Sequence, residues 1–310
     1  MKFIIVYIFL TFYIYKKYFN WQRKSKDNME IVSSISRMQE LSALAHRDGR
    51  IIGFVPTMGY LHEGHLSLMR IARKKCDVLV VSIFVNPTQF GAGEDLAQYP
   101  RDIERDKKLC REEGVDVIFL PDEREMYPEN YSTYVEVSGN ITNVLCGYFR
   151  PGHFRGVATV VAKLFNIVQP HFAVFGQKDG QQLAVIRRMV RDLNYPVEII
   201  GAPTVREPDG LAMSSRNEYL TPKERKVAPT LYKSLLLAKE LIESGERNPK
   251  VIIDAMRNMI EKTGLFRIQY IEVVDADTLR PVKKIDGKVM IALAAFLGKA
   301  RLIDNIIVSS

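Results

Sequence analysis

Residues 51–65, Ile-Ile-Gly-Phe-Val-Pro-Thr-Met-Gly-Tyr-Leu-His-Glu-Gly-His, decide the fold of this chain. The stretch opens with an apolar run that is typical of a buried strand, and a helical pattern begins at His65. Gly59 and Gly64 allow a ligand to approach the backbone closely, and the amino terminus of a helix offers free N–H groups to an anion. The stretch therefore predicts a strand, an anion-binding loop and a helix.

Short β-branched runs alternate with helical patterns as far as residue 200. We expect strands at 51–55, 77–85, 116–120, 172–175 and 197–200, helices at 65–75, 101–113, 156–168 and 181–194, and a hairpin-like stretch at 133–137. Strands that alternate with helices of roughly ten or more residues form βαβ units. The sequence therefore predicts an α/β fold with a doubly wound, Rossmann-like parallel sheet, which binds ligands at the carboxyl ends of its strands.

The pattern changes after Pro203. A loop over 205–217 precedes expected helices at 222–244 and 250–263 and expected strands at 268–274, 289–294 and 303–308. We therefore expect a nucleotide-binding catalytic domain over 29–204 and a second, smaller α+β domain over 205–310.

Residues 1–28 do not belong to this pattern. Their apolar run, Phe3 to Tyr15, is shorter than the roughly 20 residues that a membrane-spanning helix needs. They carry a net charge of +5 out of the chain's +8, so the remaining residues carry +3, and we expect neither a nucleic-acid nor a membrane partner. The extension is interpreted either as an interfacial anchor or as translated sequence upstream of a working start at Met29, and we expect it not to pack on the core.

Cysteines give no support for secretion or for a metal site. Cys76, Cys110 and Cys146 are widely spaced and form no CxxC pair. This usage is typical of a reducing compartment, so we expect a cytoplasmic protein, and no residue is assigned to a resident metal.

Two histidines in the loop after the first strand are the leading candidates for chemistry. His62 and His65 are three positions apart, so both can address one ligand, such as a phosphate. A zinc site and simple helix caps are the alternatives, although His-Glu-Gly-His is one residue short of the HExxH zinc motif.

Polar side chains follow two further strands. Gln89 is an uncharged amide suited to a hydroxy-acid substrate, while Asn86 either joins it or only organises the loop. Lys178 suits phosphate oxygens, Asp179 suits a nucleotide hydroxyl or Mg²⁺, and Gln182 follows one turn later.

Two basic loops complete the set of candidates. Ser214, Ser215 and Arg216 lie in the 205–217 loop, which either closes over a polyphosphate or only links two domains. Arg150 and Arg155 either face the same cleft or lie in a solvated turn, and their role is left open.

Five motifs in order carry a resemblance to a known family. They are PTMGYLHEGH, VNPTQFG with EDLAQYPRD, RPGHFRG, FGQKDGQQ and LAMSSRNEYL. The first and last resemble the HIGH and KMSKS elements of the class I aminoacyl-tRNA synthetase and nucleotidyltransferase superfamily. The whole pattern, over residues 29 to 310, resembles the pantoate–β-alanine ligase (pantothenate synthetase) family.

This resemblance implies a two-step ligation. The carboxylate of pantoate attacks the α-phosphorus of ATP, and the amine of β-alanine then attacks the acyl carbon of pantoyl adenylate and releases AMP. It implies that His62, His65, Lys178 and Arg216 are catalytic, with His65 as proton donor. It implies Mg²⁺ with ATP and a cytoplasmic homodimer.

The resemblance also implies binding residues. Gln89 and Gln182 bind pantoate, with Gln89 also near β-alanine. The implied ATP contacts are Met58, Gly59, Tyr60, Leu61, His62, Glu63, Gly64, His65, Gly176, Gln177, Lys178, Asp179, the backbone at Val205, Met213, Ser214, Ser215 and Arg216.

Alternatives and departures remain. Another nucleotidyltransferase of this superfamily is one alternative, but a phosphorylated substrate would favour Arg or Lys over the two glutamines. A membrane-tethered nucleotide-binding module is the other, and it rests on residues 1–28 alone. Gly180 stands where the family more often has a bulkier residue, which predicts a looser helix start.

Overall fold

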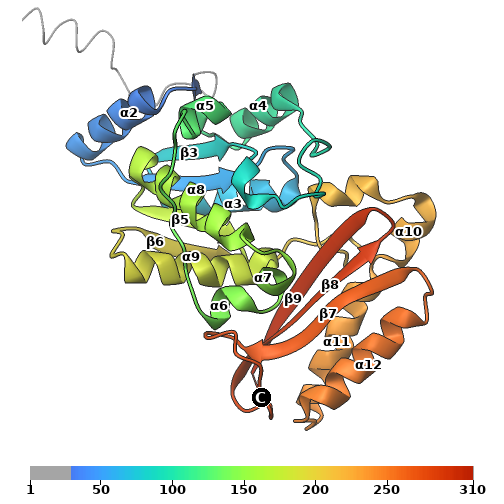
Figure 1. Cartoon of the computed structure of the whole chain (residues 1–310). Helices are drawn as coiled ribbons and strands as arrows, with labels where there is room; N and C mark the ends of the chain where they lie inside the picture. Colours follow the sequence, from blue (N-terminus) through green and yellow to red (C-terminus); the bar gives the residue numbers. More distant parts are fainter. Residues whose placement is uncertain (1–28, 310) are drawn as a thin grey trace, which may run out of the picture.

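A six-stranded sheet dominates the computed structural model of the protein, which describes residues 29–309 (Figure 1). Every pair in this sheet is parallel, and the order is β1-β4-β3-β2-β5-β6. The strands are β1 (Glu30–Val32), β2 (Ile52–Thr57), β3 (Val78–Ile83), β4 (Val117–Phe119), β5 (Phe172–Gly176) and β6 (Glu198–Ala202). The predicted doubly wound α/β class is confirmed. Strand order reverses between β2 and β5, which is where such sheets bind ligands.

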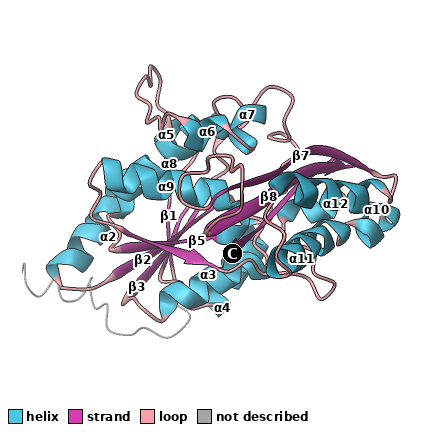
Figure 2. Ribbon diagram, turned by 90° about the horizontal axis from the view of Figure 1, so that it is seen from below, coloured by secondary structure: helices cyan, strands magenta, loops and turns pink. Residues whose placement is uncertain are grey.

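Helices cover both faces of this sheet (Figure 2). The helices α2 (Ile35–Arg47), α8 (His153–Val168) and α9 (Gly180–Asp192) share one apolar cluster, while α3 (Glu63–Arg73) and α4 (Ile103–Glu112) share another. Alternate strand residues enter alternate clusters, as Phe54 and Val55 do. Because both faces are covered, the strands are almost continuously apolar.

A second, antiparallel sheet lies beside the first (Figure 1). It contains β7 (Phe266–Asp275), β8 (Lys288–Leu297) and β9 (Ala300–Ser309) in that order. The helices α11 (Thr230–Glu243) and α12 (Pro249–Glu261) pack on it, and α10 (Pro222–Val227) precedes them. The expected smaller α+β unit is thus present, and a domain boundary near residue 204 stays a prediction.

Three sequence expectations differ from the structure. No strand forms at 133–137, because the backbone N–H of Val135 donates to Thr159 Oγ1 of α8 (3.0 Å) instead of to a partner strand. The helix expected over 222–244 is two helices, since the ring and missing N–H of Pro229 interrupt a helix interior. The strand β1 and the helix α2 were not predicted.

Short helices shape the loops around the sheet. They are α5 (Glu123–Met126), α6 (Asn140–Asn143), α7 (Cys146–Phe149) and the 3₁₀ turns η1 (Pro87–Gln89), η2 (Gln177–Asp179) and η3 (Ser215–Tyr219). Within residues 29–309, no helix is both long enough and apolar enough to span a bilayer. The expectation for residues 1–28 lies outside the described residues.

Candidate active site

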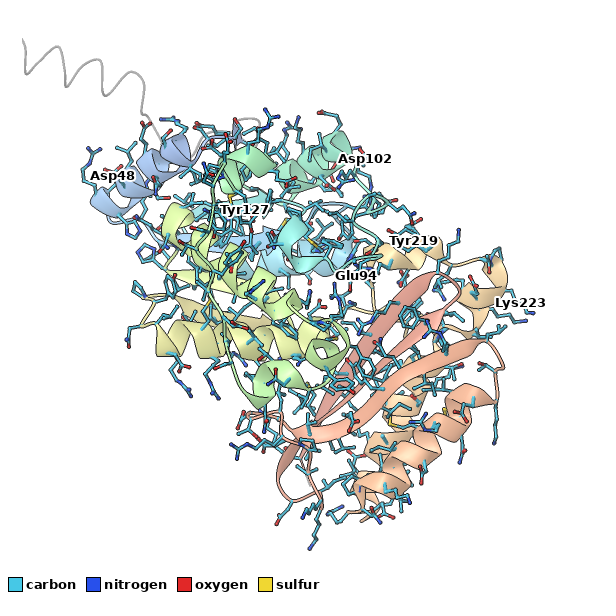
Figure 3. All side chains as sticks on the ribbon, viewed as in Figure 1. Asp48, Glu94, Asp102, Tyr127, Tyr219 and Lys223 are labelled. Carbon is cyan, nitrogen blue, oxygen red and sulfur yellow. The ribbon has the colours of Figure 1, made fainter. Side chains whose placement is uncertain are left out.

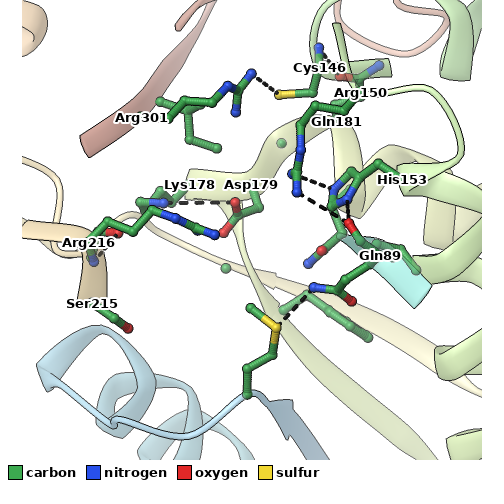
Figure 4. A pocket seen from close by; sticks show the side chains of 18 of the residues that line it. Gln89, Cys146, Arg150, His153, Lys178, Asp179, Gln181, Ser215, Arg216 and Arg301 are labelled. Carbon is green, nitrogen blue, oxygen red and sulfur yellow. Dashed lines mark hydrogen bonds and ion pairs between the residues drawn. The ribbon is translucent and has the colours of Figure 1, made fainter. Parts of the chain in front are cut away.

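A cleft of about 870 Å³ lies at the carboxyl ends of the central strands (Figure 4). Its walls are formed by the loops after β2, β3, β5 and β6 and by the facing side of β8 and β9. The cleft is therefore at the position that the reversal of strand order predicts, and both sheets contribute to it.

His62 and His65 hold the start of α3 through their ring nitrogens. His62 Nδ1 accepts from the N–H of Gly64 (3.1 Å), and His65 Nδ1 accepts from the N–H of His62 (3.3 Å). The two ring centroids are 4.1 Å apart. The histidines do cap the helix, which was one of the alternatives from the sequence, but both also line the cleft.

These bonds and the surrounding charges define the protonation of both rings. Loss of solvent, with the nearby charge of Lys178, lowers the pKa of His62 to about 4. Loss of solvent lowers the pKa of His65 well below its usual value, with His62 and Lys178 as smaller causes. Each neutral ring accepts at Nδ1, so its proton is on Nε2 and can be donated to a ligand.

In residues 29–309 no three His, Cys, Asp or Glu side chains converge as metal ligands.

Asp106 of α4 was not predicted, yet it holds the turn before the histidines. Its carboxylate accepts from the N–H of Tyr60 (2.7 Å) and of Leu61 (2.8 Å) and is 1% exposed. Gly59 has φ +81°, and a Cβ there would be 3.0 Å from Asp106 Oδ2. The turn thus requires both glycine and the buried carboxylate. Asp106 is 46 residues from Tyr60 in the chain, so no local pattern reveals it.

Gln89 is held by Asn86 and by the close approach of α8. Asn86 Nδ2 donates to Gln89 Oε1 (3.2 Å) and to the carbonyl of Gly156 (3.2 Å). A Cβ on Gly156 would come within 2.2 Å of Thr88 O, so only glycine allows this contact. Among the described residues, Gln89 Nε2 donates only to the sulfur of Met58, a weak acceptor, at 3.0 Å, so it can still donate to a ligand. Asn86 organises the loop, which was one of its two predicted roles.

Arg150 and His153 hold the backbone carbonyl of Gln89. The guanidinium of Arg150 donates to Glu94 (2.7 Å) and to the carbonyl of Gln89 (3.3 Å). His153 Nδ1 is 2.8 Å from the same carbonyl, and its Nε2 is 3.0 Å from Arg150 Nη1. Burial, with the charge of Arg150, lowers the pKa of His153 to about 4. Arg155, in contrast, lies over the ring of Tyr134 and does not line the cleft.

The η2 turn carries Lys178 and Asp179 into the cleft. Their charged atoms are 3.8 Å apart, and Asn305 of β9 donates to the carbonyls of Gln177 (3.0 Å) and Lys178 (2.8 Å). Asn305, also missed from sequence, therefore fixes this turn from the second sheet. Gln182 of α9 lines the cleft, and its side-chain amide has no hydrogen-bond partner among residues 29–309.

Gly180 begins α9 with regular helical dihedrals, φ −55° and ψ −40°. A Cβ there would be 2.9 Å from Met290 Sδ and 3.2 Å from Asn305 Oδ1. A larger residue would therefore require Met290 to move.

Arg216 is engaged by an acid rather than free. Its Nε and Nη2 donate to the two carboxylate oxygens of Asp95, both at 2.9 Å. The hydroxyl of Tyr219 donates to the carbonyl of Gln98 (3.2 Å), and Figure 3 shows Tyr219 where the two sheets' units meet, near Glu94. The 205–217 loop is thus bound across the cleft to Asp95 through Arg216, and Tyr219 just after it is bound to Gln98.

Most of the expected site residues share this cleft. They are Met58, His62, Gly64, His65, Gln89, Gly176, Lys178, Asp179, Gln182, Val205, Met213, Ser214, Ser215 and Arg216. Five expected ATP contacts do not line it: Gly59, Tyr60, Leu61, Glu63 and Gln177. The side chain of Leu61 is in the core, and Glu63 pairs with Arg70, so these side chains are committed elsewhere.

The fold and the cleft define an α/β nucleotide-binding enzyme class in which a histidine pair lies at a helix amino terminus. Comparison with known proteins narrows this class. The family model for pantoate-beta-alanine ligase matches residues 30–307, so the chain belongs to this family.

Relatives agree with this assignment. The chain is 60% identical to a pantothenate synthetase of Thermotoga neapolitana, over 90% of this chain and 99% of that one. Identity to the enzyme of Moorella thermoacetica is 58%, over 90% and 98%. The crystal structure of pantothenate synthetase from Thermus thermophilus matches with TM-score 0.85 and 49% identity, over 90% of this chain and 99% of that one.

A further solved structure carries ligands. It is the pantoate-beta-alanine ligase of Francisella tularensis, complexed with beta-gamma ATP and beta-alanine. It matches with TM-score 0.76 and 37% identity, over 90% of this chain and 97% of that one.

Proposed function

We propose that this protein is an AMP-forming ligase that joins pantoate to β-alanine through pantoyl adenylate. The observation that carries this proposal is one cleft holding two neutral Nε2–H imidazoles and Lys178 opposite the uncharged amides of Gln89 and Gln182. Donors and a cation suit the triphosphate, whereas amides suit a hydroxy acid that carries no phosphate. The neutral amides therefore disfavour another nucleotidyltransferase acting on a phosphorylated substrate.

In the first step, a carboxylate oxygen of pantoate attacks the α-phosphorus of ATP. A new P–O bond forms, the bond to the β-phosphate oxygen breaks, and pyrophosphate leaves with the electron pair. His62, His65 and Lys178 donate to the phosphate oxygens on which negative charge grows, which lowers the barrier. Burial lowers the pKa of His62 to about 4 and the pKa of His65 well below its usual value, so both neutral imidazoles can donate an N–H at neutral pH.

Pantoate is oriented by the two glutamines. Gln89 presents Nε2, and the side-chain amide of Gln182 has no partner among residues 29–309. Asn86 and the Arg150–His153 pair keep the Gln89 loop in place. Because these supports are buried or half-buried, the carboxylate would be aimed at the α-phosphorus before reaction.

In the second step, the unprotonated amine of β-alanine attacks the acyl carbon. The C–N bond forms, the C–O bond to AMP breaks, and the amine loses a proton. The acyl adenylate would also react with water, so a loop that closes over the cleft has a purpose. In the structure Arg216 of this loop is paired with Asp95. Arg216 would exchange Asp95 for phosphate oxygens when ATP enters.

The proposal also includes a metal ion, an oligomeric state, a cellular location and a domain boundary. Mg²⁺ would enter bound to ATP, and the exposed carboxylate of Asp179 in the cleft fits an ion that is otherwise held by phosphate oxygens and water. We also propose a cytoplasmic homodimer whose domains divide near residue 204. Sedimentation at equilibrium tests the dimer.

Isotope transfer tests the adenylate directly. Pantoate labelled with ¹⁸O in its carboxylate is incubated with ATP, β-alanine and the enzyme, and AMP is analysed by mass spectrometry. We expect one ¹⁸O atom in AMP. Label that stays wholly in pantothenate, or release of ADP in place of AMP, contradicts the mechanism. Carboxyl-labelled β-alanine is the control and transfers no label to AMP.

A further inference from the structure

One face of the β8–β9 hairpin forms a wall of the cleft. Arg301, Ile303 and Asn305 alternate along β9 and lie opposite Phe296, Ala294 and Ala292 of β8. Because strand side chains alternate between faces, Leu293, Ala295 and Leu302 pack instead in the apolar cluster that contains α11 and α12. Arg301 is the charged side chain among these six residues and lines the cleft (Figure 4). Lys299 and Asp304 of the same hairpin also line it, and Asp304 is paired with Arg206.

A β-bulge holds this guanidinium. The register between β7 and β8 shifts between Ile268 and Tyr270, which leaves Gln269 as the extra residue. Gln269 Oε1 accepts from Arg301 Nε (2.9 Å) and Nη2 (2.8 Å), while Nη2 is also 3.4 Å from Cys146 Sγ. A bulge next to a site commonly re-aims a side chain. Here it fixes the guanidinium through Nε and Nη2, and no hydrogen bond to Nη1 is formed by residues 29–309, so Nη1 is left for a ligand.

The partners of Arg301 are neutral, unlike those of the other cleft arginines. Arg150 pairs with Glu94, and Arg216 pairs with Asp95. Within residues 29–309, no carboxylate lies at ion-pair distance from Arg301. A half-buried guanidinium whose charge is not balanced by a carboxylate is suited to bind an anion.

Several contacts place this charge beside the pantoate site rather than at the phosphate loops. Cys146, which contacts Arg301, donates its backbone N–H to Gln181 Oε1 (2.9 Å), next to Gln182. The charge of Arg301 also contributes to the lowered pKa of His153, whose Nδ1 is 2.8 Å from Gln89 O. An anion on Arg301 would thus lie near the acyl group that the glutamines hold.

We propose that Arg301, oriented by Gln269, binds the carboxylate of the amine substrate and selects an ω-amino acid over an uncharged amine. This inference rests on the proposed ligation. The carboxylate of pantoate must reach the α-phosphorus and becomes an uncharged acyl group there. The carboxylate of β-alanine, in contrast, stays charged and unreacted throughout, so it needs a permanent cation.

The test compares two amines in Arg301→Met. β-Alanine and β-alaninamide differ only in the charged end, so the ratio of their kcat/KM values reports recognition of the carboxylate. We expect the variant to lower this preference roughly 10–100-fold, the loss typical of one charged hydrogen-bonding group. Lys288→Met, which removes a charge from the exposed far end of β8, is the control and should keep the wild-type preference.

A second readout separates this assignment from the proposed function. Pantoate-dependent exchange of pyrophosphate into ATP needs no amine, so Arg301→Met should alter KM for ATP and pantoate by no more than about twofold. If Arg301→Met catalyses pyrophosphate exchange and still prefers β-alanine over β-alaninamide as the wild type does, the assignment of Arg301 is overturned and the proposed function is not. A raised KM for ATP or pantoate with an unchanged preference also overturns it. Absence of exchange and of pantothenate in the wild type overturns the proposed function itself, and the assignment with it.

A second variant covers the case in which Arg301→Met does not fold. Gln269→Leu keeps the guanidinium but removes its support, so we expect a smaller loss of the same preference. Arg301→Lys should restore part of the preference, because a charge returns without the planar fork. If neither variant changes the preference, Arg301 does not bind the amine substrate.

Discussion

Replacement of Asp106 by alanine tests whether the loop before the histidine pair is held by one buried carboxylate. The change removes the acceptor of the Tyr60 and Leu61 N–H groups while leaving every residue of the cleft in the chain. Asp106 does not line the cleft, so any effect on catalysis must pass through the turn and reach His62 and His65.

The size of the effect follows from the two bonds. Each buried N–H left without an acceptor costs about 1–3 kcal/mol of folding free energy. Removal of a carboxylate that burial disfavours offsets part of this, since burial raises the pKa of Asp106. We therefore expect a loss of about 2–4 kcal/mol, or about 3–8 °C in Tm for a chain of this size.

The catalytic effect should exceed what stability explains. A displacement of about 1 Å in catalytic groups costs roughly 10²-fold in rate. We expect pantoate-dependent ATP–pyrophosphate exchange by Asp106→Ala to fall by about this factor at a temperature where the variant is fully folded. Circular dichroism on the same sample establishes that the protein is folded.

Asp102→Ala is the matched control. Asp102 accepts from the Arg105 N–H (3.1 Å) as the exposed amino-terminal cap of the same helix, so its loss costs about 0.5–2 kcal/mol and should leave the exchange rate unchanged. The reasoning about Asp106 is refuted if Asp106→Ala keeps the wild-type Tm and exchange rate, or if both variants lose the same activity.

Three further outcomes are expected. Alanine at His65 or Lys178 should lower turnover by roughly 10²–10³-fold while the chain stays folded, although His65→Ala also removes the acceptor of the His62 N–H and should lower Tm. Wild-type turnover in either variant would show that the residue only caps or solvates. Folding lowers the pKa of His62 and of His153 from 6.5 to about 4, so the unfolded state binds more protons between these pH values. The free energy of unfolding should therefore fall as the pH drops from about 6.5 to 4. A free energy of unfolding that stays constant over this range in urea titrations would contradict this. A chain that starts at Met29 should match the full chain in Tm and turnover, since the family match covers 30–307, and a destabilised or inactive product would reject this.

The sequence by itself determined the fold class and most of the cleft. Strand and helix periods are local, and a parallel sheet needs apolar residues on both faces, so β2 to β6 were predicted from runs such as 51–55. Ligands gather at the carboxyl ends of such strands, so the histidine pair, Gln89 and Lys178 were expected to meet, and they line one cleft.

Only the tertiary structure decided what orients those residues. Asp106, His153, Gln269, Arg301 and Asn305 act through contacts between elements distant in sequence, and each is an ordinary polar residue in its local context. The stretch at 133–137 shows the same limit, since a side chain of α8 took the bond that a strand would have used. Local sequence patterns predict where the backbone turns and which side chains are buried. The partner of a buried polar group, in contrast, depends on which distant residues the completed fold places beside it.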